Sequence, residues 1–321
     1  MSLTLRAMFP ALLLSLSLTQ GLPAAAADAP PAAPATPAAD APIERAPLLS
    51  REQEEAQALE RRLPAQDLQQ LQAGSTSFLA LWKPANSDDP QGAVIIVAGA
   101  GESADWPHVV GPLRRKFPDI GWATLSLPLP DTQDPALLTR EAEPAPDAAT
   151  APAANEPSGE AGKEALTPAA DEIAAQTAAA QAVAQAEAEQ IFSRIDSAIA
   201  FALQNKARSI VLLGHNSGAY WATRFANERA DAKVQKLVLV NAREPQDAMP
   251  SLLELIPNLK VKTADFIYKN HQGGNAEQRL QTSKRTKGPG YTQIGLVDMA
   301  GNADAEQEQI FRRIRGWVQA E

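Results

Sequence analysis

The stretch SIVLLGHNSG at residues 209–218 decides the fold. Its first five residues form a short, continuous apolar run, which is typical of a β-strand buried on both faces of a sheet. Two glycines, Gly214 and Gly218, then bracket His215, Asn216 and Ser217, and a helix-compatible segment follows. The pattern predicts a buried strand, a sharp turn at Asn216 and a helix.

Other segments on both sides of this stretch carry strand or helix patterns. Strands are predicted at residues 77–82 (an edge strand), 92–98, 122–127, 234–240, 261–268 and 291–297. Helices are predicted at residues 50–73 (capped by Ser50 and broken at Pro64), 106–117, 180–204 and 305–318. Alternation of buried strands with helices predicts an α/β fold, with a mostly parallel sheet covered by helices on both faces.

The first 27 residues have the organisation of a secretory signal peptide. Arg6 supplies a short positive region, residues 7–19 are apolar but too few to span a bilayer, and small residues precede a cleavage site after Ala27. An uncleaved membrane anchor is the alternative. No later stretch reaches the ~18 apolar residues of a spanning helix. We expect a periplasmic or secreted protein without a membrane span once the signal is removed.

Two segments are rich in proline and alanine and lack the branched side chains of a core. Residues 28–47 predict an extended linker, and residues 140–170 predict a disordered insertion. The insertion interrupts a single predicted domain at residues 48–321.

Composition excludes several classes of function. With 29 basic and 38 acidic residues the net charge is −9, which argues against binding to nucleic acid. The absence of cysteine excludes a disulfide framework, a thiolate nucleophile and a cysteine zinc site, and three dispersed histidines indicate no metal centre. No cofactor is expected.

The order of strand, Gly-rich turn, helix, strand, helix, strand and G-x-x-x-G turn resembles the α/β-hydrolase superfamily. The resemblance covers about residues 75–321 outside the insertion. Within that superfamily, residues 92–130 and the terminal RRIRGW at 312–317 look like an uncharacterised group of exported Gram-negative proteins. The resemblance implies the fold but no substrate.

The same resemblance implies where a catalytic triad would lie. Asn216 stands at the nucleophile position of the G-x-S-x-G turn, and Asn302 stands at the histidine position before the last helix. Asn cannot act as a general base, so both functions are predicted to be lost. The acid has no clear counterpart: Asp265 lies inside the strand at 261–268, and His271 lies in the turn beyond it.

Residues beside the turn have competing interpretations. Ser217 is a fallback nucleophile, but a serine at a helix start commonly supports the helix N-terminus. The side chain of His215 is expected to point away from that of Asn216 and to pack. Glu102 either lines the cleft or caps the next helix, and the backbone N–H groups of Ala100 and Ser217 could form a residual oxyanion hole. The candidate binding residues are Ala100, Gly101, Glu102, His215, Asn216 and Ser217.

Three functions are compatible with these patterns. The first is a catalytically inactive hydrolase fold that binds a small molecule or an envelope protein. The second is an active, esterase-like hydrolase that uses Ser217 with His271 or His215. The third is an envelope adaptor, which would show an apolar surface patch instead of a cleft.

Overall fold

The central sheet is built from the apolar runs on either side of the turn at Asn216. In a computed structural model of the chain, the described residues are 49–131, 170–229, 233–246, 248–268, 275–285 and 290–320, all within one compact unit, Leu48–Glu321. Within these ranges one eight-stranded sheet has the order β1-β2-β4-β3-β5-β6-β7-β8. Its strands are β1 (Leu68–Ala73), β2 (Thr76–Lys83), β3 (Gly92–Val97), β4 (Trp122–Leu127), β5 (Ile210–His215), β6 (Val234–Val240), β7 (Lys262–Tyr268) and β8 (Tyr291–Leu296).

Burial on both faces explains the continuous apolar runs. The β1–β2 and β2–β4 pairs are antiparallel, and every other neighbouring pair from β4 to β8 is parallel. Every residue of β3, β4 and β5 is buried. In β3, Ile95 faces one apolar cluster while Ile96 faces another on the opposite side of the sheet. The predicted fold class is therefore confirmed.

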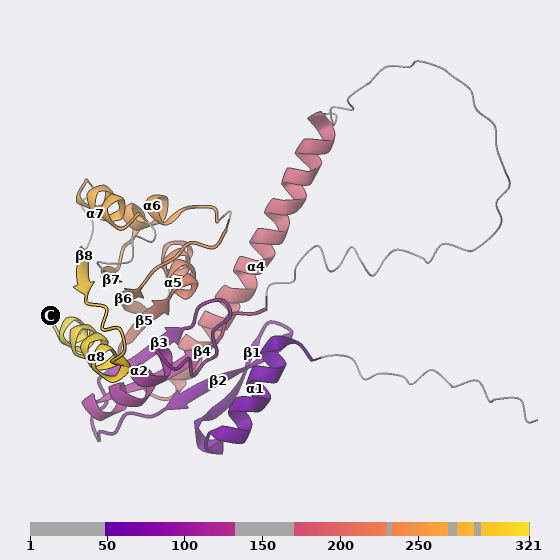
Figure 1. The fold of residues 1–321 in the computed structure, drawn as a ribbon. Coiled ribbons are helices and arrows are strands. Elements are labelled where there is room, and N and C mark those ends of the chain that lie inside the picture. Colours follow the sequence, from indigo (N-terminus) through magenta and orange to yellow (C-terminus); the bar gives the residue numbers. More distant parts are fainter. Residues whose placement is uncertain are drawn as a thin grey trace, which may run out of the picture. The chain divides into compact units, whose positions relative to one another are not determined.

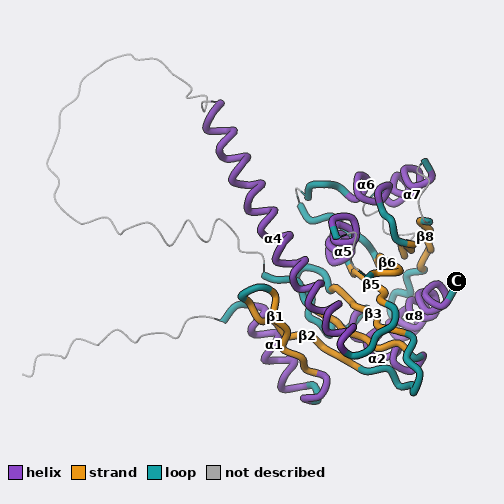
Figure 2. Tube along the Cα trace, turned by 180° about the vertical axis from the view of Figure 1, so that it is seen from behind, coloured by secondary structure: helices purple, strands orange, loops and turns teal. Residues whose placement is uncertain are grey.

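Helices cover both faces of the sheet (Figure 1). The α-helices are α1 (Arg51–Arg62), α2 (Val110–Lys116), α4 (Ala170–Gln204), α5 (Ser217–Glu228), α6 (Leu252–Leu255), α7 (Ala276–Lys284) and α8 (Ala303–Gln319). Short 3-10 helices of the described residues are η1 (Ala65–Asp67), η2 (Phe117–Ile120) and η3 (Ile256–Asn258). Helices α4, α5 and α6 pack in the cluster that contains Ile95, and α2 and α8 pack in the cluster that contains Ile96. Figure 2 shows the same arrangement from behind.

The predicted helix at residues 50–73 is wrong in its second half. Helix α1 begins after Ser50, as expected, but it ends at Arg62, and residues 68–73 form strand β1. Leu71 and Ala73 are buried while Gln72 between them is exposed, which is the alternation of a strand. Because β1 pairs with the outer side of β2, the strand predicted at 77–82 is internal and not an edge strand.

The other elements follow the predicted order with shifted boundaries. Helix α2 begins only at Val110, because residues 98–109 form turns, and α4 begins at Ala170. Helices α6 and α7 were not predicted. The predicted signal peptide, the linker at 28–47 and the insertion up to residue 169 lie outside the described residues. Among the described helices, none is long and apolar enough to cross a membrane.

Candidate functional site

The turn at Asn216 places that residue at the carboxyl edge of the sheet. Its backbone has φ 50° and ψ −122°, directly between β5 and α5. Asn is one of the few residues apart from Gly that tolerate positive φ. The backbone N–H of Asn216 donates to the carbonyl of Val240 (3.1 Å), and its own carbonyl accepts from the N–H groups of Ala219 and Arg243 (3.1 Å each). Hydrogen bonds therefore fix the sharp turn to the end of β6, to the first turn of α5 and to the residues that follow β6.

Close backbone approach explains the two glycines that flank the turn. A Cβ atom on Gly214 would lie 2.4 Å from the Cα of Ala219, and one on Gly218 would lie 2.3 Å from the carbonyl oxygen of Val97. Such distances exclude any side chain without movement of the backbone. The G-x-x-x-G spacing is thus a packing requirement: Gly214 lets β5 approach the start of α5, and Gly218 lets α5 approach the end of β3.

The side chain of Asn216 bridges two polar residues. Its amide nitrogen donates to Oε1 of Glu102 (2.5 Å), and its Oδ1 accepts from the amide nitrogen of Asn241 (2.7 Å). Asn241 directly follows β6 and itself has a positive φ of 51°. The amide uses two separate atoms for these bonds, a nitrogen that donates and an oxygen that accepts. A serine nucleophile would have a single hydroxyl oxygen in their place.

Glu102 is the central acid of this network. It is buried, and its Oε2 accepts from the backbone N–H of Gly99 (2.7 Å) and is 2.7 Å from Nδ1 of His215. Burial acts to raise the pKa of the carboxyl group, but the hydrogen bond and positive charge of His215, together with the bonds from Gly99 and Asn216, outweigh it and lower the pKa. Glu102 is therefore an ionised carboxylate with three donors around it.

His215 is more than a packing residue. It is buried, and its Nδ1 is held by Glu102 while its ring lines a pocket. Glu102 connects the side chains of His215 and Asn216, although the two residues follow one another along the chain. A carboxylate that holds one imidazole nitrogen orients the ring and determines which nitrogen faces outward.

Ser217 is not placed as an activated nucleophile. It is the first residue of α5, and its Oγ accepts a hydrogen bond from the backbone N–H of Ala100 (2.7 Å). The N–H group that could have polarised a substrate carbonyl is thus already bound within the protein. Gly101, the residue after Ala100, is exposed and has a positive φ of 78°. Its carbonyl accepts a hydrogen bond from the guanidinium of Arg51.

The remaining positions of the expected triad lie elsewhere. Asn302 precedes α8, and its Oδ1 accepts from the N–H of Ala305 (3.1 Å), so it caps the helix. Asp265 is fully buried in β7, where its Oδ2 accepts from Arg279 (2.7 Å) and from Tyr291 (2.5 Å). Burial and the nearby Asp265 raise the pKa of Tyr291, so this tyrosine stays neutral. Asp265 thus anchors α7 and β8. His271 lies outside the described residues.

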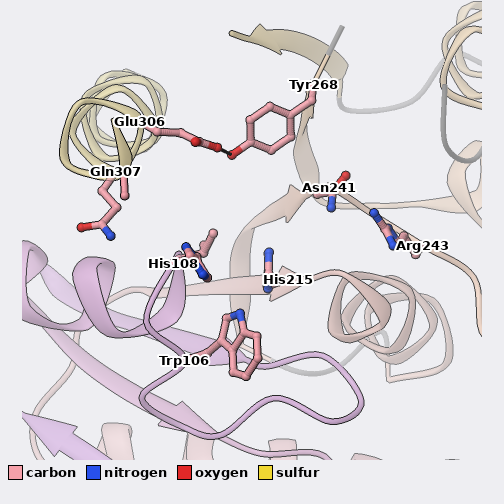
Figure 3. A pocket seen from close by; sticks show the side chains of 10 residues that line it. Trp106, His108, His215, Asn241, Arg243, Tyr268, Glu306 and Gln307 are labelled. Atoms are coloured by element: carbon pink, nitrogen blue, oxygen red, sulfur yellow. Dashed lines mark hydrogen bonds between the residues drawn. The ribbon is translucent and has the colours of Figure 1, made fainter. Parts of the chain in front are cut away.

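A pocket of about 240 Å³ opens beside His215 (Figure 3). Loops at the carboxyl ends of the strands and the start of α8 supply its walls. The lining residues are Trp106, His108, Val109, His215, Asn241, Arg243, Tyr268, Ala303, Glu306 and Gln307. Of the binding residues predicted from the sequence, His215 alone is among them. Within the described ranges, no group of three or more potential ligands could hold a metal ion.

Buried ion pairs hold the loop that carries Glu102 and Trp106. Asp105 accepts from Arg114 (3.2 Å) and from Arg115 (3.0 Å), and Arg114 also reaches Asp67 at 3.0 Å. The side chain of Arg114 is 2% exposed, so its bonds to Asp105 and Asp67 are shielded from water, whereas Arg115 is half exposed. The loop is therefore a fixed wall of the site.

The chain shows its relationships most clearly at the level of fold. Residues 9–320 match the family described as "Protein of unknown function (DUF3530)". The chain belongs to this family. No curated protein matches it.

Solved structures resemble the chain at low sequence identity. The esterase Pf2001 from Pyrococcus furiosus has a TM-score of 0.51 and 11% identity, over 78% of this chain and 89% of that one. Est1E from Butyrivibrio proteoclasticus has a TM-score of 0.50 and 9% identity, over 79% of this chain and all (100%) of that one. These similarities show the α/β-hydrolase fold.

Proposed function

We propose that this protein is an exported α/β-hydrolase-fold protein that binds a small polar molecule and does not hydrolyse esters. One observation carries the proposal: Asn216, at the nucleophile position, uses both ends of its amide to join Glu102 to Asn241. The side-chain amide of an asparagine is neither a nucleophile nor a general base. Loss of one triad member typically lowers the rate by about 10⁴-fold to 10⁶-fold.

The hydrogen bond between Ser217 and Ala100 argues against the esterase alternative. General-base activation requires the hydroxyl to lie within hydrogen-bond reach of a base. In the described part of the chain, the hydrogen bond at the hydroxyl of Ser217 comes from the backbone N–H of Ala100, and no described imidazole is hydrogen-bonded to that hydroxyl. The pocket beside His215 supports binding of a small molecule better than the adaptor role, for which an apolar surface patch was expected.

Hydrolysis of 4-nitrophenyl butyrate by the purified protein tests the catalytic part of this proposal. We expect no release of nitrophenol above the buffer rate, and the same result for Ser217→Ala. Turnover by the wild type that Ser217→Ala abolishes would establish the esterase alternative instead.

Export is the second part of the proposal, and the signal-like first 27 residues support it. Mass spectrometry of the protein isolated from a Gram-negative host should give an N-terminus at Asp28. A chain that keeps Met1 and stays in the cytoplasm would contradict export.

A further inference from the structure

We propose that the pocket beside His215 binds a small carboxylate monoanion. This inference rests on the proposed binding function and names its ligand class.

Three nitrogen-bearing basic side chains converge on the pocket. The chain contains three histidines, and two of them, His108 and His215, are lining residues. The third group is the guanidinium of Arg243, which makes no hydrogen bond or ion pair with any described residue. A planar guanidinium matches a carboxylate through two parallel N–H···O bonds. Such a cluster in a chain of net charge −9 indicates an anionic ligand.

His215 presents one of its two ring nitrogens to the pocket. The residue is 5% exposed, and Glu102 occupies its Nδ1. Its Nε2 has no hydrogen-bond partner among the described residues, and the ring extends into the pocket (Figure 3). A carboxylate oxygen at Nε2 would supply the partner when that nitrogen carries a proton.

Glu306 limits how much negative charge the pocket accepts. It is the one carboxylate among the lining residues, and it accepts a hydrogen bond from the hydroxyl of Tyr268. Burial and the bond to Glu306 raise the pKa of Tyr268, which keeps that hydroxyl protonated. Ala303, the first residue of the 17-residue helix α8, also lines the pocket and brings the positive end of the helix dipole to it. The carboxylates of Glu306 and of Glu102, which contacts His215 from behind, stand against Arg243 and this helix end, and this balance favours a monoanion over a dianion.

Size and shape define the rest of the ligand. A volume of about 240 Å³ is below the range of about 300–1,000 Å³ that is typical of drug-sized ligands. Trp106 and Val109 give one wall an aromatic and apolar surface, with Trp106 at the foot of the view in Figure 3. A flat, apolar body of about the size of a benzene ring, carrying one carboxylate, fits this combination.

Benzoate, benzamide and benzamidinium test the proposal because they share one shape and differ in charge. Each is titrated into the purified mature protein, and the imidazole signals of the three histidines are followed by two-dimensional NMR. We expect benzoate to bind about ten-fold more tightly than benzamide, and benzamidinium to bind most weakly. The signals of His108 and His215 should shift.

Arg243→Gln separates the anion site from the pocket as a whole. The substitution keeps the backbone N–H that donates to Asn216 and removes only the charge. We expect it to weaken benzoate about ten-fold and to leave benzamide unchanged. Arg61→Gln, at an exposed position in the last turn of α1, is the matched control and should change neither affinity.

Each contrary result has its own meaning. Binding of benzamide as tight as that of benzoate overturns the anion assignment and leaves the binding function standing. Benzoate affinity that survives Arg243→Gln, or tighter binding of phenyl phosphate, also overturns it, as does the absence of any shift at His215. Hydrolysis of phenyl acetate would instead overturn the proposed function.

Discussion

Glu102 and His215 lie 113 residues apart in the sequence, yet Oε2 of the first is 2.7 Å from Nδ1 of the second. The same carboxylate binds the side chain of Asn216, so the loop after β3 and the turn after β5 share one buried charge. Three hydrogen bonds to one carboxylate make Glu102 the acid on which the geometry of the site depends.

Glu102→Gln should destabilise the protein by about 2 kcal/mol at pH 7, because a buried hydrogen-bond acceptor of three groups loses its charge. For a domain of this size the melting temperature should fall by about 4–8 °C. Thermal unfolding followed by circular dichroism measures this. Glu60→Gln, on the exposed face of α1, is the control and should change the melting temperature little.

The difference in melting temperature between the wild type and Glu102→Gln should also depend on pH. The pKa of Glu102 is lowered from its ordinary value of 4.5, so the folded state favours the carboxylate. Its stabilising effect is fully present well above pH 4.5 and is lost as the pH falls through the lowered pKa. The difference in melting temperature between wild type and Glu102→Gln should therefore be constant near neutral pH and shrink below pH 4.5. A constant difference down to the acid limit of folding would contradict this.

Gly218→Ala and Gly316→Ala should have opposite effects on stability. The new Cβ at 218 would lie 2.3 Å from the carbonyl oxygen of Val97, whereas nothing lies within 4 Å of one at 316, inside α8. We expect a loss of about 3 kcal/mol or more at 218, from overpacking. At 316 we expect a gain of about 0.5–1 kcal/mol, because Ala suits a helix interior better than Gly. Urea denaturation compares the two, and equal effects would contradict the close approach of β3 and α5.

The fold was predictable because its central strands are apolar on both faces and the turn at Asn216 needs two glycines. The start of β1 was not predictable from the sequence. Leu68 and Leu71 are three residues apart, and this spacing suits a helix as well as a strand. Only pairing with β2 selects the strand, and this pairing depends on contacts distant from the local pattern.

The site was predictable only around the turn. Asn216, His215 and Glu102 stand next to glycine-rich motifs that mark strand ends. Arg243 and Tyr268 carry no such motif, and they come together because β6 and β7 follow β5 in the sheet order and bring their carboxyl ends to one edge. The contact between His215 and Glu102 depends on how the loop after β3 folds back, which no local pattern specifies.

Asp265→Asn should destabilise the protein without affecting the pocket. The substitution removes the carboxylate charge that pairs with the guanidinium of Arg279, which is 2% exposed. Breaking a buried ion pair in this way costs about 3–5 kcal/mol. Chemical denaturation measures the loss, with the exposed Asp88→Asn as control. Because Asp265 is not a lining residue of the pocket, benzoate affinity should stay unchanged under conditions where the variant is folded. A loss of affinity with unchanged stability would instead indicate a role for Asp265 in the site.

Asn216→Ser restores the residue type of an active nucleophile turn and should still give no esterase turnover. The serine would lose the bonds to Glu102 and Asn241, which should destabilise the fold by about 1–2 kcal/mol. It would gain no imidazole base, because no described imidazole is hydrogen-bonded to the side chain at position 216 and Asn302, at the histidine position, caps α8. The N–H of Ala100 would also remain bound to Ser217. Hydrolysis of 4-nitrophenyl butyrate measures the outcome, with Asn216→Ala as a control that lacks any hydroxyl. Turnover by Asn216→Ser that Asn216→Ala does not show would mean that an imidazole already faces position 216, and the site would then be an esterase centre that lacks only its nucleophile.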